Sequence, residues 1–60
     1  MEMSEIHVHA RRFVGAHGDK AELEAAQRAS ECEKQGDKVQ AADWRRIQAA
    51  IREMLGPRSK

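Results

Sequence analysis

The step Gly18-Asp19-Lys20 recurs as Gly36-Asp37-Lys38, and these two steps decide how the chain folds. Glycine tolerates the left-handed backbone that closes a helix. An aspartate that follows it is able to cap the free amides at the start of the next helix. Each step therefore predicts one helix end followed directly by a helix start. The two steps divide the 60 residues into three segments, and we predict helices over residues 4–17, 19–35 and 37–55.

The first segment has the apolar spacing of an amphipathic helix. Ser4 is the candidate N-cap, with Met3 and Val8 placed around it as a hydrophobic staple. At about 100° per residue, one face collects Ile6, Ala10, Phe13, Val14 and His17. The alternation over residues 6–10 also fits a strand. A short strand with no partner elsewhere in the chain is unstable, so the helix is favoured.

The second segment combines a capping pattern with a stripe of small side chains. Asp19-x-x-Glu22 fits a capping box at its start. The stripe consists of Ala21, Ala25, Ala29 and Cys32. Leu23, Ala26 and Ser30 extend this face sideways. A stripe of this kind lets a neighbouring helix approach to the lower end of the ~8–10 Å range. We place the polar residues on the opposite face: Lys20, Glu24, Gln27, Arg28, Glu31 and Lys34.

The third segment carries the strongest apolar stripe in the chain. Asp37-x-x-Gln40 repeats the capping pattern at its start. Gly56-Pro57 ends it, because glycine closes the helix and proline does not continue it. The stripe consists of Trp44, Ile47, Ile51, Met54 and Leu55, flanked by Ala41 and Ala50. We predict an all-α fold, a compact three-helix unit with short Gly-Asp connections, forming one domain over residues 1–57 with a loose tail at 58–60.

The composition favours association with another protein. Of 24 apolar residues ten are alanine, and the aromatic residues are Phe13 and Trp44. A chain of this length buries only about 60% of the surface that it exposes when unfolded, so its stability alone is marginal. The single cysteine, Cys32, excludes an intrachain disulfide. We therefore expect a homodimer or a larger protein partner. The residues expected to form core and interface are Trp44, Ile47, Ile51, Met54 and Leu55, with Ala21, Ala25 and Ala29 as a packing surface.

The distribution of charge points to contacts inside the molecule. The net charge is +1, which gives no strong preference for nucleic acid or membrane. Residues 19–36 hold five acidic and three basic residues, whereas residues 37–60 hold three acidic and six basic ones, so these segments attract each other. No apolar run approaches the ~20 residues of a membrane span. The N-terminus lacks the pattern of a secretion signal, and we expect a cytoplasmic protein.

The reactive residues have ordinary structural explanations. His7 and His9 diverge by about 200° on a helix, and His17 lies at a helix end, where the dipole favours a protonated imidazole. Zinc bridging two copies stays an open alternative. Cys32 lies between two glutamates, which disfavour its thiolate. No phosphate-binding glycine loop or Ser-His-Asp spacing occurs in the sequence. A three-helix chain of this size also has little room for a concave pocket of the ~300 Å³ that small ligands need. We expect no enzymatic activity, metal, cofactor or small-molecule substrate.

Nucleic-acid binding through the third helix is the alternative function. The basic residues concerned are Lys38, Arg45, Arg46 and Arg52. A helix-turn-helix protein places its second helix in the major groove in this way. Asp43 and Glu53 interrupt the basic surface, and nucleic-acid affinity demands a sustained one. We rank this function below protein–protein interaction.

One set of capping and core residues is similar to a known pattern. The set contains His17-Gly18-Asp19, Ala21, Ala25-Ala26, Arg28, Gly36-Asp37, Trp44, Ile47, Ala50-Ile51 and Leu55. Over about residues 10–55 the chain resembles a family of small uncharacterised bacterial proteins with the pattern HGD-x-A … GD … W-x-x-I-x-x-A-I. Lys38 and Gln40 depart from it, since small or acidic residues are equally usual there. The resemblance implies a bacterial, intracellular helical domain without an assigned activity.

Overall fold

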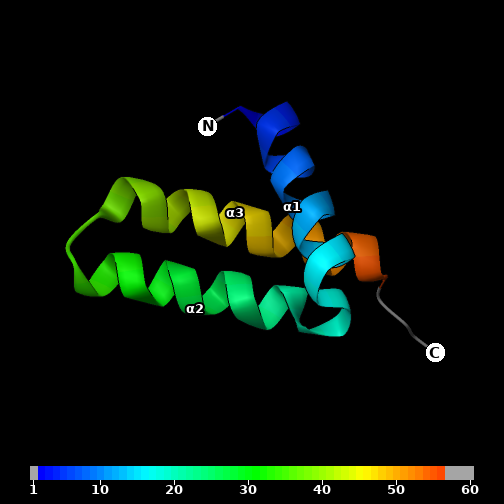
Figure 1. The fold of residues 1–60 in the computed structure, drawn as a ribbon. Coiled ribbons are helices and arrows are strands. Elements are labelled where there is room, and N and C mark those ends of the chain that lie inside the picture. The colour runs from blue at the N-terminus through cyan, green and yellow to red at the C-terminus, as the bar shows by residue number, and fades with distance from the viewer. Residues whose placement is uncertain (1, 57–60) are drawn as a thin grey trace.

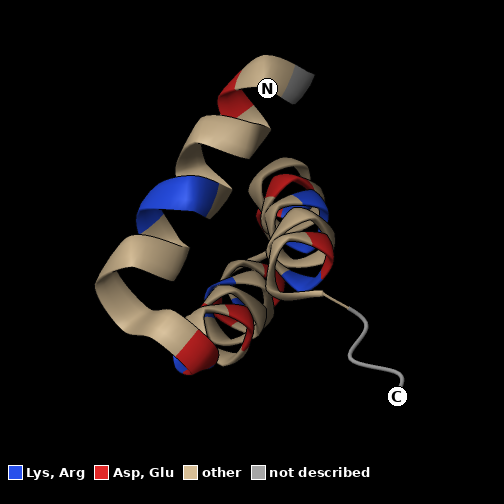
Figure 2. Ribbon diagram, turned by 90° about the vertical axis from the view of Figure 1, so that its right-hand side faces the viewer, with Lys and Arg blue, Asp and Glu red and all other residues tan. Residues whose placement is uncertain are grey.

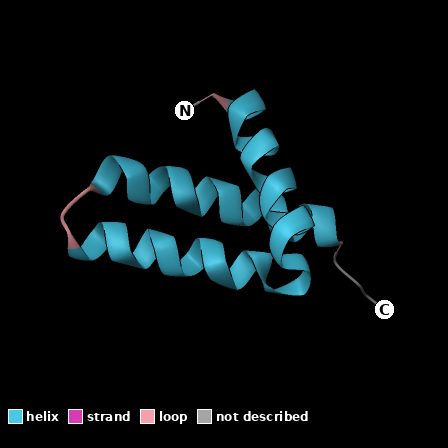
Figure 3. Ribbon diagram, viewed as in Figure 1, coloured by secondary structure: helices cyan, strands magenta, loops and turns pink. Residues whose placement is uncertain are grey.

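The chain is built from helices joined by short turns (Figure 1). The computed structural model describes residues 2–56, apart from the side chain of Met3. Its elements are α1 (Met3–His17), the short 3₁₀ helix η1 (Gly18–Lys20), α2 (Ala21–Lys34) and α3 (Lys38–Leu55). No strand occurs in this part of the chain (Figure 3), so the all-α prediction is confirmed and the strand alternative at residues 6–10 is wrong. Pro57 and the predicted tail at 58–60 lie outside the described residues.

The helices α2 and α3 lie side by side and antiparallel, and α1 crosses them at a steep angle near the end of α3 (Figure 1). The α2–α3 contact is the most extensive in the molecule, and α1 contacts both helices. No loop separates α1 from α2, because η1 follows His17 directly and leads into Ala21, while the chain changes direction at Gly18, which has a positive φ. The first of the two predicted connections is therefore a bent helical junction.

The start of α1 differs from the prediction. The helix begins at Met3 and its N-cap is Glu2, whose backbone is extended and whose side chain makes no capping hydrogen bond. The amide of Ile6 donates to the carbonyl of Glu2 at 2.9 Å, so the first helical turn closes on Glu2. Ser4 already lies inside that turn, and its prediction as N-cap is wrong.

The junction at Gly18 follows the sequence pattern only in part. Gly18 has φ +60°, in the region that favours glycine, and its amide donates to the carbonyl of Val14. Closure of α1 by glycine is therefore confirmed. Asp19 caps nothing: it lies within η1, and neither η1 nor α2 has a side-chain capping bond. The amide of Ala21 is instead satisfied by the main-chain carbonyl of Gly18, so the predicted capping box with Glu22 is wrong and α2 starts two residues later.

The turn between α2 and α3 follows the sequence pattern closely. Gly36 has φ +81°, and the carboxylate of Asp37 accepts a hydrogen bond from the amide of Gln40 at 3.1 Å. Asp37 is thus the N-cap of α3, as predicted. Its own amide donates to the carbonyl of Cys32 at 2.8 Å, which closes α2. At the other end of α3, Gly56 has φ +85° and terminates the helix as expected.

The core lies where α1 crosses α2 and α3. Among the described residues, the large side chains that are completely buried are Ile6, Ile47 and Ile51. The remaining buried side chains are all alanines: Ala10, Ala21, Ala25, Ala29, Ala41 and Ala50. Phe13, Val14, Trp44 and Leu55 are partly buried and pack against this cluster. The small side chains of α2 let the isoleucines of α3 lie close to its backbone.

Opposite charges join α2 to α3 at the surface. Arg45 donates to Glu33 at 3.3 Å, and Arg52 forms an ion pair with Glu22 at 3.5 Å. Both signs of charge lie along both helices (Figure 2). The predicted attraction between the acidic middle segment and the basic last segment is therefore confirmed. The side chains of Arg45 and Glu33 are about half exposed and that of Arg52 is mostly exposed, so water screens both pairs and each contributes about 0–1 kcal/mol.

Candidate interaction surface

The apolar stripe predicted for α3 divides between the core and the surface. Ile47 and Ile51 are buried by α1 and α2. Trp44 and Leu55 are only partly buried, and Met54 is 39% exposed. The exposed parts of this stripe, and not its isoleucines, are accessible to a partner. Ala21, Ala25 and Ala29 are completely buried and make contacts only within the chain.

An aromatic pair and an arginine from three different helices meet beside the core. The rings of Phe13 in α1 and Trp44 in α3 lie 5.3 Å apart between centroids and are tilted by 58°. The guanidinium carbon of Arg28 in α2 lies 5.5 Å from the centroid of each ring. The imidazole of His17 lies 5.1 Å from the Phe13 ring on the other side. We call Phe13, Arg28 and Trp44 the aromatic cluster.

Helical geometry explains why Arg28 reaches this cluster. At about 100° per residue, Arg28 lies only about 20° from Ala21 around the helix. It therefore borders the stripe of small residues, and its predicted place on the opposite face is wrong. Leu23 lies about 200° from Ala21 by the same geometry. It is 56% exposed, so the prediction that it extends the buried face is also wrong.

The two rings hold the Arg28 guanidinium without using its hydrogen-bond donors. A cation–π contact uses the charge of the guanidinium and none of its N–H donors. Within residues 2–56, Arg28 forms no ion pair, although Glu24 lies one helical turn before it. An exposed cation–π contact contributes about 0.5–1 kcal/mol, which restricts the side chain before any partner arrives. The cluster thus presents a positioned cation next to half-exposed aromatic surface.

The predicted basic surface of α3 is partly neutralised inside the molecule. Arg45 and Arg52 point toward α2, where each is paired with a glutamate. Lys38 and Arg46 are exposed. The four residues of the nucleic-acid alternative therefore do not act as one sustained basic patch.

The histidines and the cysteine do not converge. His7 and His17 are exposed and His9 is half-buried. Within residues 2–56, no group of three or more His, Cys, Asp or Glu side chains is placed to hold a metal ion. Cys32 is half-buried, and its thiol lies 3.9 Å from Oε1 of Gln40.

The expectation that the fold has little room for a pocket of ~300 Å³ is wrong. A hollow of about 670 Å³ is open to solvent between α2 and the end of α3. Its lining includes Glu22, Arg52 and Leu55. The ion pair of Glu22 with Arg52 lies in this lining.

Comparison with known proteins found no matching protein-family model, no matching curated protein and no matching solved structure. The resemblance to a bacterial family therefore stays a prediction. None of the helices within residues 2–56 combines the length and hydropathy that crossing a bilayer requires.

Proposed function

We propose that this chain is a small non-enzymatic interaction protein, a compact three-helix unit that acts as a homodimer. The observation that carries the proposal is the composition of the core. Among the side chains that the structure describes, only Ile6, Ile47 and Ile51 are large and fully buried. Complete burial of such a side chain stabilises a fold by about 1.5–3 kcal/mol, and an alanine contributes much less. A second copy would add the buried area that this core lacks.

The aromatic cluster supports an interaction role for a specific part of the surface. Trp44 and Arg28 are of the residue types most enriched among the side chains that dominate binding energies. Phe13 and Trp44 are half-buried in the monomer, so their remaining exposed surface is available to a partner. Because the cluster is already ordered, binding to it costs less conformational entropy than binding to mobile side chains.

Two other partners are weaker candidates. A larger protein would fit the same surface, and the chain would then act as its docking regulator or inhibitor. Nucleic acid has less support, because Arg45 and Arg52 are engaged by glutamates of α2.

The mass in solution tests the proposal. Light scattering across about 1 µM to 1 mM, the range in which moderate dimers dissociate, should give twice the chain mass of 6.8 kDa at the upper end. Trp44 is the single tryptophan and the chain has no tyrosine, so its emission reports desolvation of the cluster directly. We expect a blue shift over the same range. A folded chain that stays monomeric throughout, with unchanged emission and no protein retained on an immobilised copy, would refute the proposal.

A further inference from the structure

Four charged residues alternate in sign along one side of α2. They are Glu24, Arg28, Glu31 and Lys34, and they line one shallow surface hollow of about 410 Å³. Their spacings of four, three and three residues keep them on one side of the helix, within an arc of about 120°. Read from the start of α2, the order is acid, base, acid, base.

This order is complementary to itself when it is reversed. A second copy of α2 laid antiparallel against the first presents the order base, acid, base, acid. Glu24 then faces Lys34 of the second copy, and Arg28 faces Glu31 of the second copy. A two-fold axis repeats both pairs, because the same patch is used on each side. A parallel copy in register would place like charges opposite each other.

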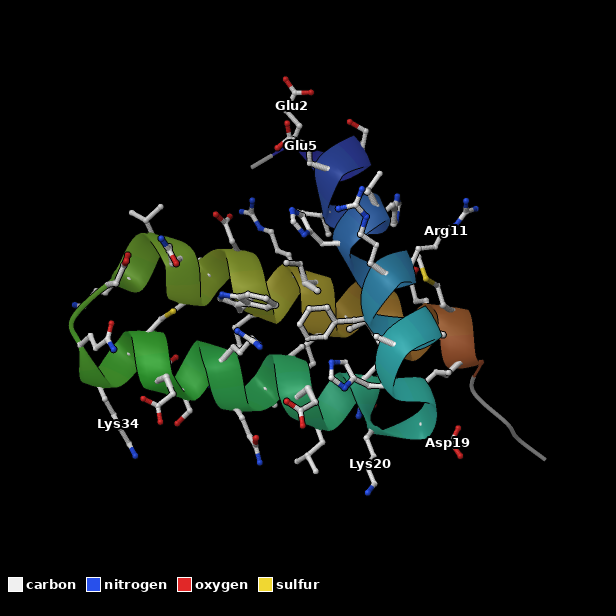
Figure 4. The ribbon with its side chains drawn as sticks, in the orientation of Figure 1. Glu2, Glu5, Arg11, Asp19, Lys20 and Lys34 are labelled. Carbon is white, nitrogen blue, oxygen red and sulfur yellow. The ribbon has the colours of Figure 1, made fainter. Side chains whose placement is uncertain are left out.

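The centre of this side lies about 120° around α2 from the centre of its buried stripe. Its edge at Arg28 borders the rings of Phe13 and Trp44. The buried stripe of α2, centred on Ala25, faces α1 and α3. Figure 4 shows Lys20 and Lys34 extending from η1 and α2 away from both other helices. Leu23, which is 56% exposed, adds apolar surface next to the charged row.

The charged row is also continuous with the aromatic cluster, because Arg28 belongs to both. The guanidinium carbon of Arg28 lies 5.5 Å from the centroid of each ring. A cation–π contact uses none of its N–H donors, so these are left to donate to a carboxylate, as arginine does in paired recognition.

We propose that a second copy of this chain docks antiparallel on the outer side of α2, with the two-fold axis at the level of Ala29. This inference rests on the proposed homodimer and names its surface. The contact of Arg28 with Glu31 of the second copy lies next to the axis, flanked by the aromatic rings. The contact of Glu24 with Lys34 of the second copy lies one to two turns further out.

Charge reversal of the outer pair tests the register. The variants are Glu24→Lys, Lys34→Glu and the double variant with both changes. Each single reversal turns two attractive contacts into two repulsive ones, because the axis repeats every pair. We expect the dimer Kd, measured by sedimentation equilibrium, to rise about tenfold or more in each single variant. The double variant restores opposite charges, and its Kd should return to within about threefold of the native value.

The interaction of Glu24 and Lys34 with the dipole of α2 makes it possible to distinguish a change in dimer Kd caused by the contact from one caused by lower stability of the monomer. Glu24 lies in the first turn of α2 and Lys34 in its last, where each is favourable to the dipole. The double variant reverses both contributions, so its isolated helix is the least stable of the set. Recovery of dimerisation in that variant would therefore come from the contact itself. Circular dichroism checks that each variant retains its helical content.

Lys20→Glu is the matched control for Lys34→Glu, since both lower the net charge by two and Lys20 lies in η1, outside the complementary row. Its Kd should equal that of the native chain. A native dimer whose Kd is the same in all variants would overturn this inference and leave the proposed function standing. Single reversals that weaken the dimer without recovery in the double variant would overturn the register. A folded native chain that is monomeric would instead refute the proposed function.

Discussion

Replacing Ile51 with alanine removes one of the three large side chains that are completely buried within residues 2–56. Ile51 is 0% exposed and belongs to the cluster that α1, α2 and α3 share. A truncation of this kind costs about 2–5 kcal/mol, depending on how far the surroundings collapse. Four of the six other buried residues of this cluster are alanines, which are too small to move into the space. We therefore expect a cost of at least 3 kcal/mol, toward the middle of the ~2–5 kcal/mol range.

That loss is large relative to the total stability of a chain this short. At about 0.05–0.15 kcal/mol per residue, 60 residues give a free energy of unfolding of about 3–9 kcal/mol. Urea denaturation followed by Trp44 emission and by circular dichroism measures the change. Ile51→Ala should unfold at a markedly lower urea concentration, or be unfolded in water. Its midpoint should also rise with protein concentration, as it does when association and folding are coupled.

The matched control is Val39→Ala on the same helix. Val39 is 75% exposed, so its truncation should change the free energy of unfolding by no more than about 0.5 kcal/mol. Equal effects of Ile51→Ala and Val39→Ala would refute the assignment of the core.

Two further pairs of variants test the helix ends. Asp37→Ala removes the cap on the Gln40 amide and should lower the free energy of unfolding, measured by urea denaturation, by about 1 kcal/mol. Asp19→Ala removes no cap and should change it by no more than about 0.5 kcal/mol. Equal losses of stability would contradict the difference between the two turns. Gly15→Ala should stabilise by about 0.5–1 kcal/mol in thermal denaturation, because Gly15 lies inside α1 with open space around it. Gly18→Ala should destabilise by about 1–2 kcal/mol, because Gly18 has φ +60°. A gain in stability at both glycines would contradict the geometry of the junction.

Local signals predicted the local structure well. The cap at Asp37 and the terminating glycines at 18, 36 and 56 depend on a few consecutive residues, and the structure confirms them. The capping pattern at Asp19 is nearly identical, yet it fails. There the amide of Ala21 is already satisfied by the carbonyl of Gly18 in the 3₁₀ turn that follows the bend at Gly18. Sequence alone does not distinguish these two outcomes.

The interaction surface depends on contacts that sequence periodicity describes only in part. The position of Arg28 beside the small stripe follows from helical geometry and was available from the sequence. The meeting of Phe13 with Trp44 was not, because it depends on the direction in which α1 leaves the junction and crosses α3. The opposite charges of the second and third segments predicted attraction, but the partners Arg45–Glu33 and Arg52–Glu22 required the register of the two helices.

The mass of the native chain at sedimentation equilibrium, measured over a series of protein concentrations, tests the central claim most directly. The claim is that three buried isoleucines and a row of complementary charges leave this fold incomplete until a second copy joins it. A concentration-dependent rise from 6.8 kDa to twice that value is the predicted result. A constant mass of one chain, with full helical content at every concentration, would contradict it.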